Sequence, residues 1–187
     1  MIRLEPFERA DFTQLIAWMD SPRFLFQWGG QSFRHPLTEQ QLEQYIEDAN
    51  TDDAHALIYR VVQEENNEVI GHINLHIDRM NQSARIGKVL IGDRGRRGQG
   101  IGQLMIRQVL AIAFEDLGLH KVSLGVLDFN HAALACYEKA GFVKEGLIRD
   151  KRKMDDEFCS VWEMSMLEEE WLEMSRTERS LKRDGVR

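Results

Sequence analysis

Residues 94–102, with the sequence Arg-Gly-Arg-Arg-Gly-Gln-Gly-Ile-Gly, form the stretch of this chain best suited to bind a ligand. They lie between a predicted strand and a segment whose apolar residues recur at helical spacing. Consecutive backbone N–H groups at a helix start, with no Cβ atoms beside them, form a concave donor site for phosphate. The three arginines add positive charge in an otherwise acidic chain. This stretch therefore predicts a phosphate-binding loop, with a ligand-free glycine-rich connector as the alternative.

Two common nucleotide motifs do not fit this loop. A Walker loop needs Lys followed by Ser or Thr after its last glycine, but Gly102 is followed by Gln103 and Leu104. The glycines at 98, 100 and 102 are spaced two and two, which also differs from the dinucleotide fingerprint. Neither ATP nor NAD is indicated.

A second pair of candidate residues lies on the predicted helix over residues 130–140. Asn130 is a preferred residue type for the position that caps a helix start. Tyr137 follows seven residues later, two helical turns on, so both residues share one face. Tyr137 is either a buried structural tyrosine or a functional one.

These two stretches resemble the GNAT superfamily of acyl-CoA-dependent N-acetyltransferases. Residues 97–102 match its Arg/Gln-x-x-Gly-x-Gly/Ala signature, and residues 126–142, with Asn130 and the Tyr-x-Lys-x-Gly-Phe ending, are similar to its second acetyl-CoA motif. The resemblance extends from about Ile2 to Met166. It is strongest to the branch that contains ribosomal-protein alanine acetyltransferases and spermidine acetyltransferases.

The resemblance implies acetyl-CoA as the co-substrate and assigns residues to it. The CoA pyrophosphate would lie on the loop Arg96, Arg97, Gly98, Gln99, Gly100, Ile101 and Gly102. The backbone of Val89, Leu90 and Ile91 would pair with the pantetheine arm and polarise the thioester carbonyl, although as residue types these three fit a plain core strand equally well. Asn130 would contact CoA as well as cap its helix.

The same resemblance makes Tyr137 the candidate general acid. A phenol with the usual pKa of about 10 can protonate the leaving CoA thiolate. The general base is less defined, because relatives often have Glu where this chain has Arg85 before Ile86-Gly87. We expect that Arg85 is not the base.

Polar side chains alternate along residues 68–77, where His72, Asn74 and His76 share one face of a predicted strand. They could line the acceptor cleft, with His72 as the candidate catalytic base, or belong to a solvated sheet face, an alternative that is stronger for His76. No third ligand at a diagnostic spacing indicates a metal site.

The predicted elements indicate an α/β, α+β layered fold. Periodicity and turn signals predict the order βα, α, βββ, αβ, αββ. Crossovers mixed with hairpins imply a central mixed, mostly antiparallel sheet of about six to seven strands, flanked by about four helices. We expect a single GNAT-like domain over residues 1–187, with its core at about 2–166 and a helical or frayed tail at 167–187 that could contribute to a homodimer contact.

Composition limits the function classes. The chain has 187 residues, 43% hydrophobic content and a net charge of -7, which indicates one folded domain and disfavours a nucleic-acid partner. The apolar runs are too short for a membrane span or an export signal, so we expect a cytoplasmic protein. Cys136 and Cys159 are far apart in the sequence and are expected to be buried thiols.

We therefore expect acetyl transfer from acetyl-CoA to a primary amine of a small molecule or a protein amino terminus by direct attack. The alternatives are a transferase of another acyl group and an acyl-CoA sensor without turnover. The acceptor is open: Glu39, Glu43 and Glu47 could attract a polyamine but fit a solvated helix face better. The aromatic segment 24–33 is the expected acceptor-side wall.

Overall fold

The protein is built around one seven-stranded sheet, and the computed structural model describes residues 1–184. The sheet order is β1-β2-β3-β4-β5-β7-β6, and neighbouring strands are antiparallel except for β4 and β5. The strands are β1 (Ile2–Pro6), β2 (Ala56–Gln63), β3 (Glu68–Asp78), β4 (Ser83–Ile91), β5 (Lys121–Leu127), β6 (Val143–Met154) and β7 (Glu157–Leu167).

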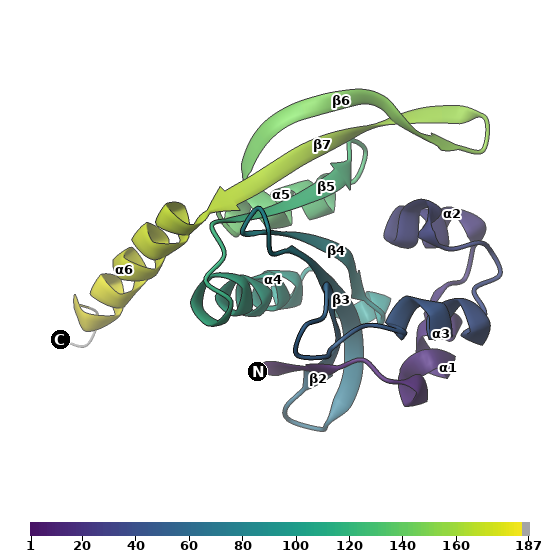
Figure 1. The fold of residues 1–187 in the computed structure, drawn as a ribbon, viewed down its shortest axis with the longest axis horizontal. Coiled ribbons are helices and arrows are strands. Elements are labelled where there is room, and N and C mark those ends of the chain that lie inside the picture. Colours follow the sequence, from purple (N-terminus) through teal and green to yellow (C-terminus); the bar gives the residue numbers. More distant parts are fainter. Residues whose placement is uncertain (185–187) are drawn as a thin grey trace.

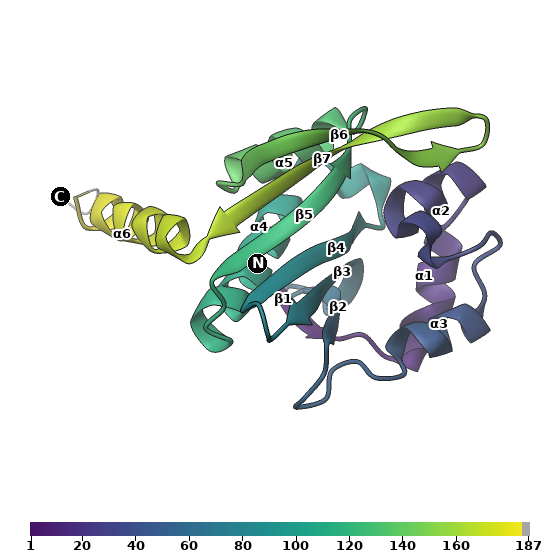
Figure 2. The ribbon, with the colours of Figure 1, turned by 45° about the horizontal axis from the view of Figure 1, so that its top comes forward.

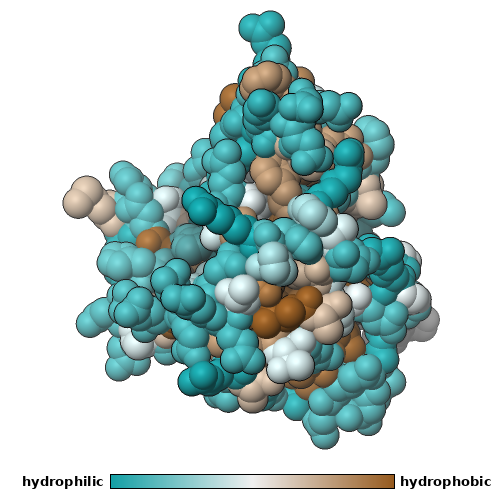
Figure 3. Space-filling model, turned by 90° about the vertical axis from the view of Figure 1, so that its right-hand side faces the viewer, coloured by the Kyte–Doolittle hydropathy of each residue, from teal (hydrophilic) through white to brown (hydrophobic). Residues whose placement is uncertain are grey.

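The described helices lie on both sides of this sheet and beyond its edge. They are α1 (Phe12–Trp18), α2 (Pro22–Gly29), α3 (Glu39–Ile46), α4 (Ile101–Ala111), α5 (His131–Lys139) and α6 (Glu168–Asp184). Helices α4 and α5 pack together on one face of the sheet, while α1, α2 and α3 gather at one end (Figure 1). Figure 3 shows that end, where hydrophobic residues near the centre are surrounded by hydrophilic ones.

Two apolar cores hold these layers. The larger one joins the sheet to α4 and α5, with Met105, Ile106 and Leu110 fully buried. The second joins α1, α2 and α3 to the sheet through Leu25, Leu42 and other apolar side chains. Segment 24–33 is thus held in place by the second core.

The parallel strands β4 and β5 separate soon after they meet. Their pairing covers only Ser83 with Lys121, Ala84 with Val122 and Arg85 with Ser123. Beyond these three pairs the strands diverge, so the later residues of β4 do not pair with β5 (Figure 2). This separation opens the centre of the sheet.

A β-bulge distorts β4 beside this opening. His72 pairs with Leu90 and Asn74 with Gly87, so Lys88 and Val89 on β4 face one residue on β3. Lys88 accordingly has a positive φ of 49°.

The structure confirms the predicted fold class and the predicted order of the strands, and residues 1–184 contain six helices where about four were expected. Segment 24–33 forms the second part of α2 followed by a short 3-10 turn at Gly30–Ser32. The expected tail is the helix α6 as far as Asp184, and residues 185–187 lie outside the described residues. No helix within the described part of the chain is long and apolar enough to cross a membrane.

Candidate active site

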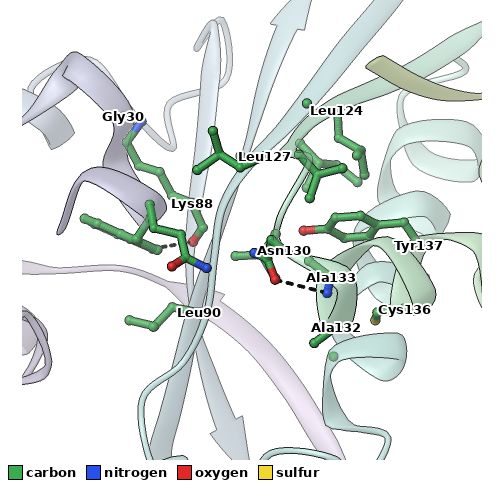
Figure 4. Close-up of a pocket in the computed structure, with 18 of the residues that line it drawn as sticks. Gly30, Lys88, Leu90, Leu124, Leu127, Asn130, Ala132, Ala133, Cys136 and Tyr137 are labelled. Carbon is green, nitrogen blue, oxygen red and sulfur yellow. Dashed lines mark hydrogen bonds between the residues drawn. The ribbon is translucent and has the colours of Figure 1, made fainter. Parts of the chain in front are cut away.

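A pocket of about 860 Å³ occupies the opening between β4 and β5. The diverging strands form two of its walls, and α2, the start of α4, α5 and the β6–β7 hairpin complete it. Figure 4 shows Lys88 and Tyr137 on opposite sides of this space. The pocket therefore brings together segments that are more than 100 residues apart in the sequence.

The glycine loop forms one end of the pocket. Gly98, Gly100 and Gly102 line it. Gly98 has φ 79° and Gly100 has φ 81°, and a Cβ atom at either position would point into open space. Gly100 is the N-cap of α4, so the first N–H groups of that helix have no partner within it. An open donor site at a helix start fits a pyrophosphate.

The side chains of the loop are not all directed to the pocket. Arg97 lines it, donates to the carbonyl oxygen of Ile91 from Nη2 at 3.1 Å and lies 5.5 Å from the ring centroid of Phe24. Arg96 instead pairs with Asp93 and Glu68, and it does not line the pocket. The expectation that Arg96 adds charge directly at the pyrophosphate is therefore not met.

Two other loop residues serve the loop itself. The Gln99 side chain donates to the carbonyl oxygen of Gly95 at 3.0 Å, and Ile101 is the first residue of α4, packed against the larger core. Neither side chain lines the pocket. Their predicted contact with CoA through the loop backbone stays a prediction.

The expected pantetheine strand and the N-cap of α5 lie at the pocket. Val89, Leu90 and Ile91 all line it, on the part of β4 that has left β5. Asn130 also lines it, and its Oδ1 accepts from the N–H of Ala133 at 3.3 Å. Asn130 thus caps α5 from a position at which it can also contact a ligand.

Tyr137 lies on the pocket wall opposite α2, and its hydroxyl points into the space between β4 and α5 (Figure 4). Its side chain is buried, with 9% of the residue exposed. Burial raises the pKa of Tyr137 well above its usual value, so the expectation of an ordinary pKa is wrong. The phenol therefore stays protonated at neutral pH and has a proton that it can donate.

His72 does not reach this pocket. Its ring is fully buried among Phe7, Trp28 and Tyr45, with centroid distances of 4.9, 5.3 and 5.8 Å. Nδ1 lies 3.0 Å from the carbonyl oxygen of Lys88. Alternation along β3 placed His72 on the same face as His76 but could not show that Phe7, α2 and α3 cover it. The expectations of a cleft-lining His72 and of a solvated face at this position are both not met.

Burial is the main reason why the pKa of His72 is lowered to about 4. In the unfolded chain this histidine has a pKa of about 6.5, so between pH 6.5 and pH 4 it is protonated in the unfolded chain but not in the folded protein. The stability contributed by neutral His72 is therefore complete above pH 6.5 and is lost as the pH falls toward 4. When the pH falls from 7 to 4.5, the free energy of unfolding of the wild type should decrease by roughly 2 to 3 kcal/mol more than that of His72→Gln. Urea unfolding at the two pH values measures this difference. Equal losses in the two proteins would contradict this assignment.

His76 lines the pocket where His72 does not. Its Nε2 lies 3.0 Å from the amide nitrogen of Asn74, which also donates to the Tyr45 hydroxyl at 2.9 Å. Desolvation, and then the charge of Lys88, lower the pKa of His76 below its usual 6.5. This ring is therefore neutral at pH 7 and can accept a proton.

Lys88 is a pocket residue that is not among the candidates identified above, although Gly87 directly before it is of the type that marks a β-bulge. Its backbone carbonyl accepts from Trp28 Nε1 at 2.8 Å and lies 3.0 Å from His72 Nδ1. Its ammonium group lies 5.0 Å from the ring centroid of Tyr45 and 5.5 Å from that of Phe33. Burial lowers the pKa of Lys88 to about 8. The β4 bulge thus holds a partly desolvated cation at the pocket.

Arg85 and the two cysteines complete the set of residues singled out from the sequence. Arg85 lines the pocket and makes two hydrogen bonds to the carboxylate of Glu163, at 2.8 and 3.1 Å. Cys159 is buried, as expected, but Cys136 is half-buried at the pocket wall, so the expectation of two buried thiols is met only for Cys159. Within residues 1–184, no group of three or more His, Cys, Asp or Glu side chains is arranged to hold a metal ion.

Comparisons with known proteins agree with this geometry. Residues 2–143 match the model of the acetyltransferase (GNAT) domain, and the chain belongs to that family. GNAT acetyltransferases transfer an acetyl group from acetyl-CoA to an amine, and the matches support this class of enzyme for the chain.

Individual relatives differ in acceptor. The chain is 39% identical over 82 residues to the probable N-acetyltransferase YjcK of Bacillus subtilis, a match that covers 44% of this chain and 42% of that protein. It is 24% identical over 148 residues to an aminoglycoside N(6')-acetyltransferase type 1 of Klebsiella pneumoniae, which covers 74% and 72% of the two chains. The solved structure of spermidine N-acetyltransferase from Vibrio cholerae with CoA and spermine shares the fold, with a TM-score of 0.79, 23% identity and coverage of 91% and 98%.

Proposed function

We propose that this protein transfers the acetyl group of acetyl-CoA directly to a primary amine of a small molecule or of a protein amino terminus. The observation that carries the proposal is one pocket that joins a glycine loop at a helix start to an unpaired strand edge and to the Tyr137 hydroxyl. These three features fit the pyrophosphate, the pantetheine arm and the thioester sulfur of one ligand.

The loop from Gly98 to Gly102 and the first N–H groups of α4 would hold the pyrophosphate, with Arg97 as the nearby cation. The backbone of Val89 to Ile91 would pair with the pantetheine arm as an added strand. Its N–H groups are suited to polarise the thioester carbonyl. Asn130 would contact CoA from the opposite wall.

Transfer needs an uncharged amine and a stabilised leaving group. The amine nitrogen adds to the acetyl carbon to give a tetrahedral intermediate, the amine proton passes to a base, and the intermediate then collapses as the bond from carbon to sulfur breaks and CoA leaves. Because His76 lines the pocket and is neutral, it replaces His72 as the candidate base. Tyr137 donates to the sulfur as negative charge develops there.

A panel of primary amines with acetyl-CoA tests the proposal, with CoA release and product mass as readouts. We expect acetylated product from at least one class of amine. Stronger release with a longer acyl-CoA or succinyl-CoA would favour a transferase of another acyl group. Binding of acetyl-CoA with no product from any amine would contradict the proposal and favour an acyl-CoA sensor.

The two histidines give a separate prediction. His76→Ala should reduce turnover at pH 7 by about 100-fold, because the amine loses its proton acceptor. The turnover of this variant should recover at a higher pH, where the amine is already unprotonated. His72→Gln should keep most of the turnover of the folded protein. Small and equal losses in both variants would point instead to a water chain or a backbone-assisted route. The measurement is the pH profile of kcat for each variant, with the acetyl-CoA thermal shift as a control for folding.

A further inference from the structure

The charged residues that line the pocket are all cations. They are Arg85, Lys88, Arg97, Lys139, Lys151 and Arg152, and no Asp or Glu of the described residues lines the pocket. The chain as a whole has a net charge of -7. A single-sign cluster in a chain of the opposite sign indicates an anionic ligand.

The CoA phosphates account for only part of this charge. Arg97 belongs to the glycine loop and Lys139 to α5, on the side of the pocket assigned to CoA. Arg85 and Lys151 share the single carboxylate of Glu163, which offsets one of their two positive charges. Lys88 and Arg152 are left, and neither has a carboxylate partner among the described side chains.

Both of these cations lie on the acceptor side, next to α2 and the turn that follows it. The Arg152 guanidinium lies about 4.0 Å from the site of a Cβ on Gly30, and its Nη1 is 3.5 Å from Gln31 Oε1. Lys88 lies over the rings of Phe33 and Tyr45, and Figure 4 shows it near Gly30 and across the pocket from Tyr137.

The position of Lys88 is built by the fold. The bulge sets its positive φ, and two buried side chains, Trp28 and His72, hold its carbonyl oxygen. A cation that is partly desolvated without a counter-charge costs free energy, which an anionic ligand would offset. Burial lowers the pKa of Lys88, and no nearby carboxylate among residues 1–184 raises it again.

We propose that the acceptor is a primary amine that also carries an oxyanion, a carboxylate or a phosphate, bound by Lys88 with Arg152 nearby. The inference rests on the proposed acetyl transfer and narrows its acceptor class. It also disfavours polyamines, because Glu39, Glu43 and Glu47 do not line the pocket and cannot offer a carboxylate there.

Matched acceptor pairs test this inference. Dipeptides are compared with their C-terminal amides, and phosphoethanolamine with ethanolamine, by kcat/KM with acetyl-CoA. We expect the anionic member of at least one pair to be preferred by about 10- to 100-fold, as for a hydrogen bond to a charged group. The pair that shows the preference distinguishes carboxylate from phosphate.

Variants of Lys88 test whether this residue causes the preference for the anionic acceptor. Lys88→Met should remove the preference by raising KM for the anionic acceptor much more than KM for its neutral partner, and Lys88→Arg should keep the preference. Lys153→Met, an exposed lysine on the same strand as Arg152 that does not line the pocket, is the matched control and should keep it too. The acetyl-CoA thermal shift must persist in Lys88→Met, which shows that the variant is folded.

Three outcomes would overturn the inference. Preference of the wild type for neutral or polycationic amines would leave acetyl transfer intact but exclude an anionic acceptor. If Lys88→Met and Lys88→Arg both lower kcat equally for the anionic and the neutral acceptor, Lys88 acts as a proton acceptor and not as an anion-binding residue. Absence of product from every amine would refute the proposed acetyl transfer itself and this inference with it.

Discussion

Tyr137→Phe is expected to reduce turnover by about 100- to 10,000-fold, equivalent to roughly 3 to 5 kcal/mol of activation free energy. The change keeps the ring, which packs in the larger core with its centroid 6.1 Å from that of Phe142, and removes only the hydroxyl. Because that hydroxyl points into the pocket and stays protonated, its loss removes the donor to the leaving sulfur. Affinity for CoA should change little.

The measurement is a single-turnover rate, which separates chemistry from product release. Tyr59→Phe is the matched control, because Tyr59 is half-buried on β2 and does not line the pocket. It should turn over at nearly the wild-type rate. A Tyr137→Phe variant that is stable, binds CoA and matches the wild type in single turnover would show that Tyr137 is not the acid. A lower Tm with activity restored on cooling would indicate a structural hydroxyl.

Much of the CoA side of the pocket could be predicted from local sequence signals. Positive φ at Gly98 and Gly100 and the helix start after Gly100 follow from a glycine-rich run before an amphipathic segment. Asn130 and Tyr137 reach the same pocket because a seven-residue separation keeps both on one helix face. Each of these features depends on residues that are neighbours in the chain.

The acceptor side could not be predicted in this way, because it depends on packing between distant segments. Period-2 alternation puts His72 and His76 on one face of β3, yet α2 and α3 cover the first and leave the second at the pocket. Arg96 faces away from the pocket because Glu68, 28 residues earlier in the chain, attracts it. Lys88 lies in a bulge that Gly87, directly before it, could have signalled, but that signal does not show which pocket the lysine side chain reaches.

The glycine-loop side of the pocket and the side lined by Lys88 also differ in the ligand groups that they can bind. In the proposed function, the glycine loop supplies backbone donors that any pyrophosphate can use, so it would bind the co-substrate without selecting the acceptor. Lys88, Arg152 and His76 line the other side of the pocket, and in the proposal their charges and proton affinity would select among amines. Variation in these three positions should therefore change acceptor choice while CoA binding is kept.

CoA binding itself is tested most sharply at Gly100. In the wild type, acetyl-CoA at about 100 times its Kd should add roughly 2.7 kcal/mol to the free energy of unfolding, a Tm rise of about 5 to 10 °C, and ATP or NAD should do much less. Gly100→Glu should abolish this rise, because it places a carboxylate beside the N–H groups at the start of α4.

Gly100→Ala separates backbone strain from that charge. Both substitutions force an L-residue to φ 81°, which costs about 1 to 2 kcal/mol and lowers the starting Tm by a similar amount in each variant. A Cβ at this position meets no other atom within 4 Å, so alanine leaves the donor site open. The alanine variant should therefore keep most of the acetyl-CoA shift that the glutamate variant loses. A full shift in Gly100→Glu, measured by differential scanning fluorimetry, would exclude the start of α4 as the pyrophosphate site.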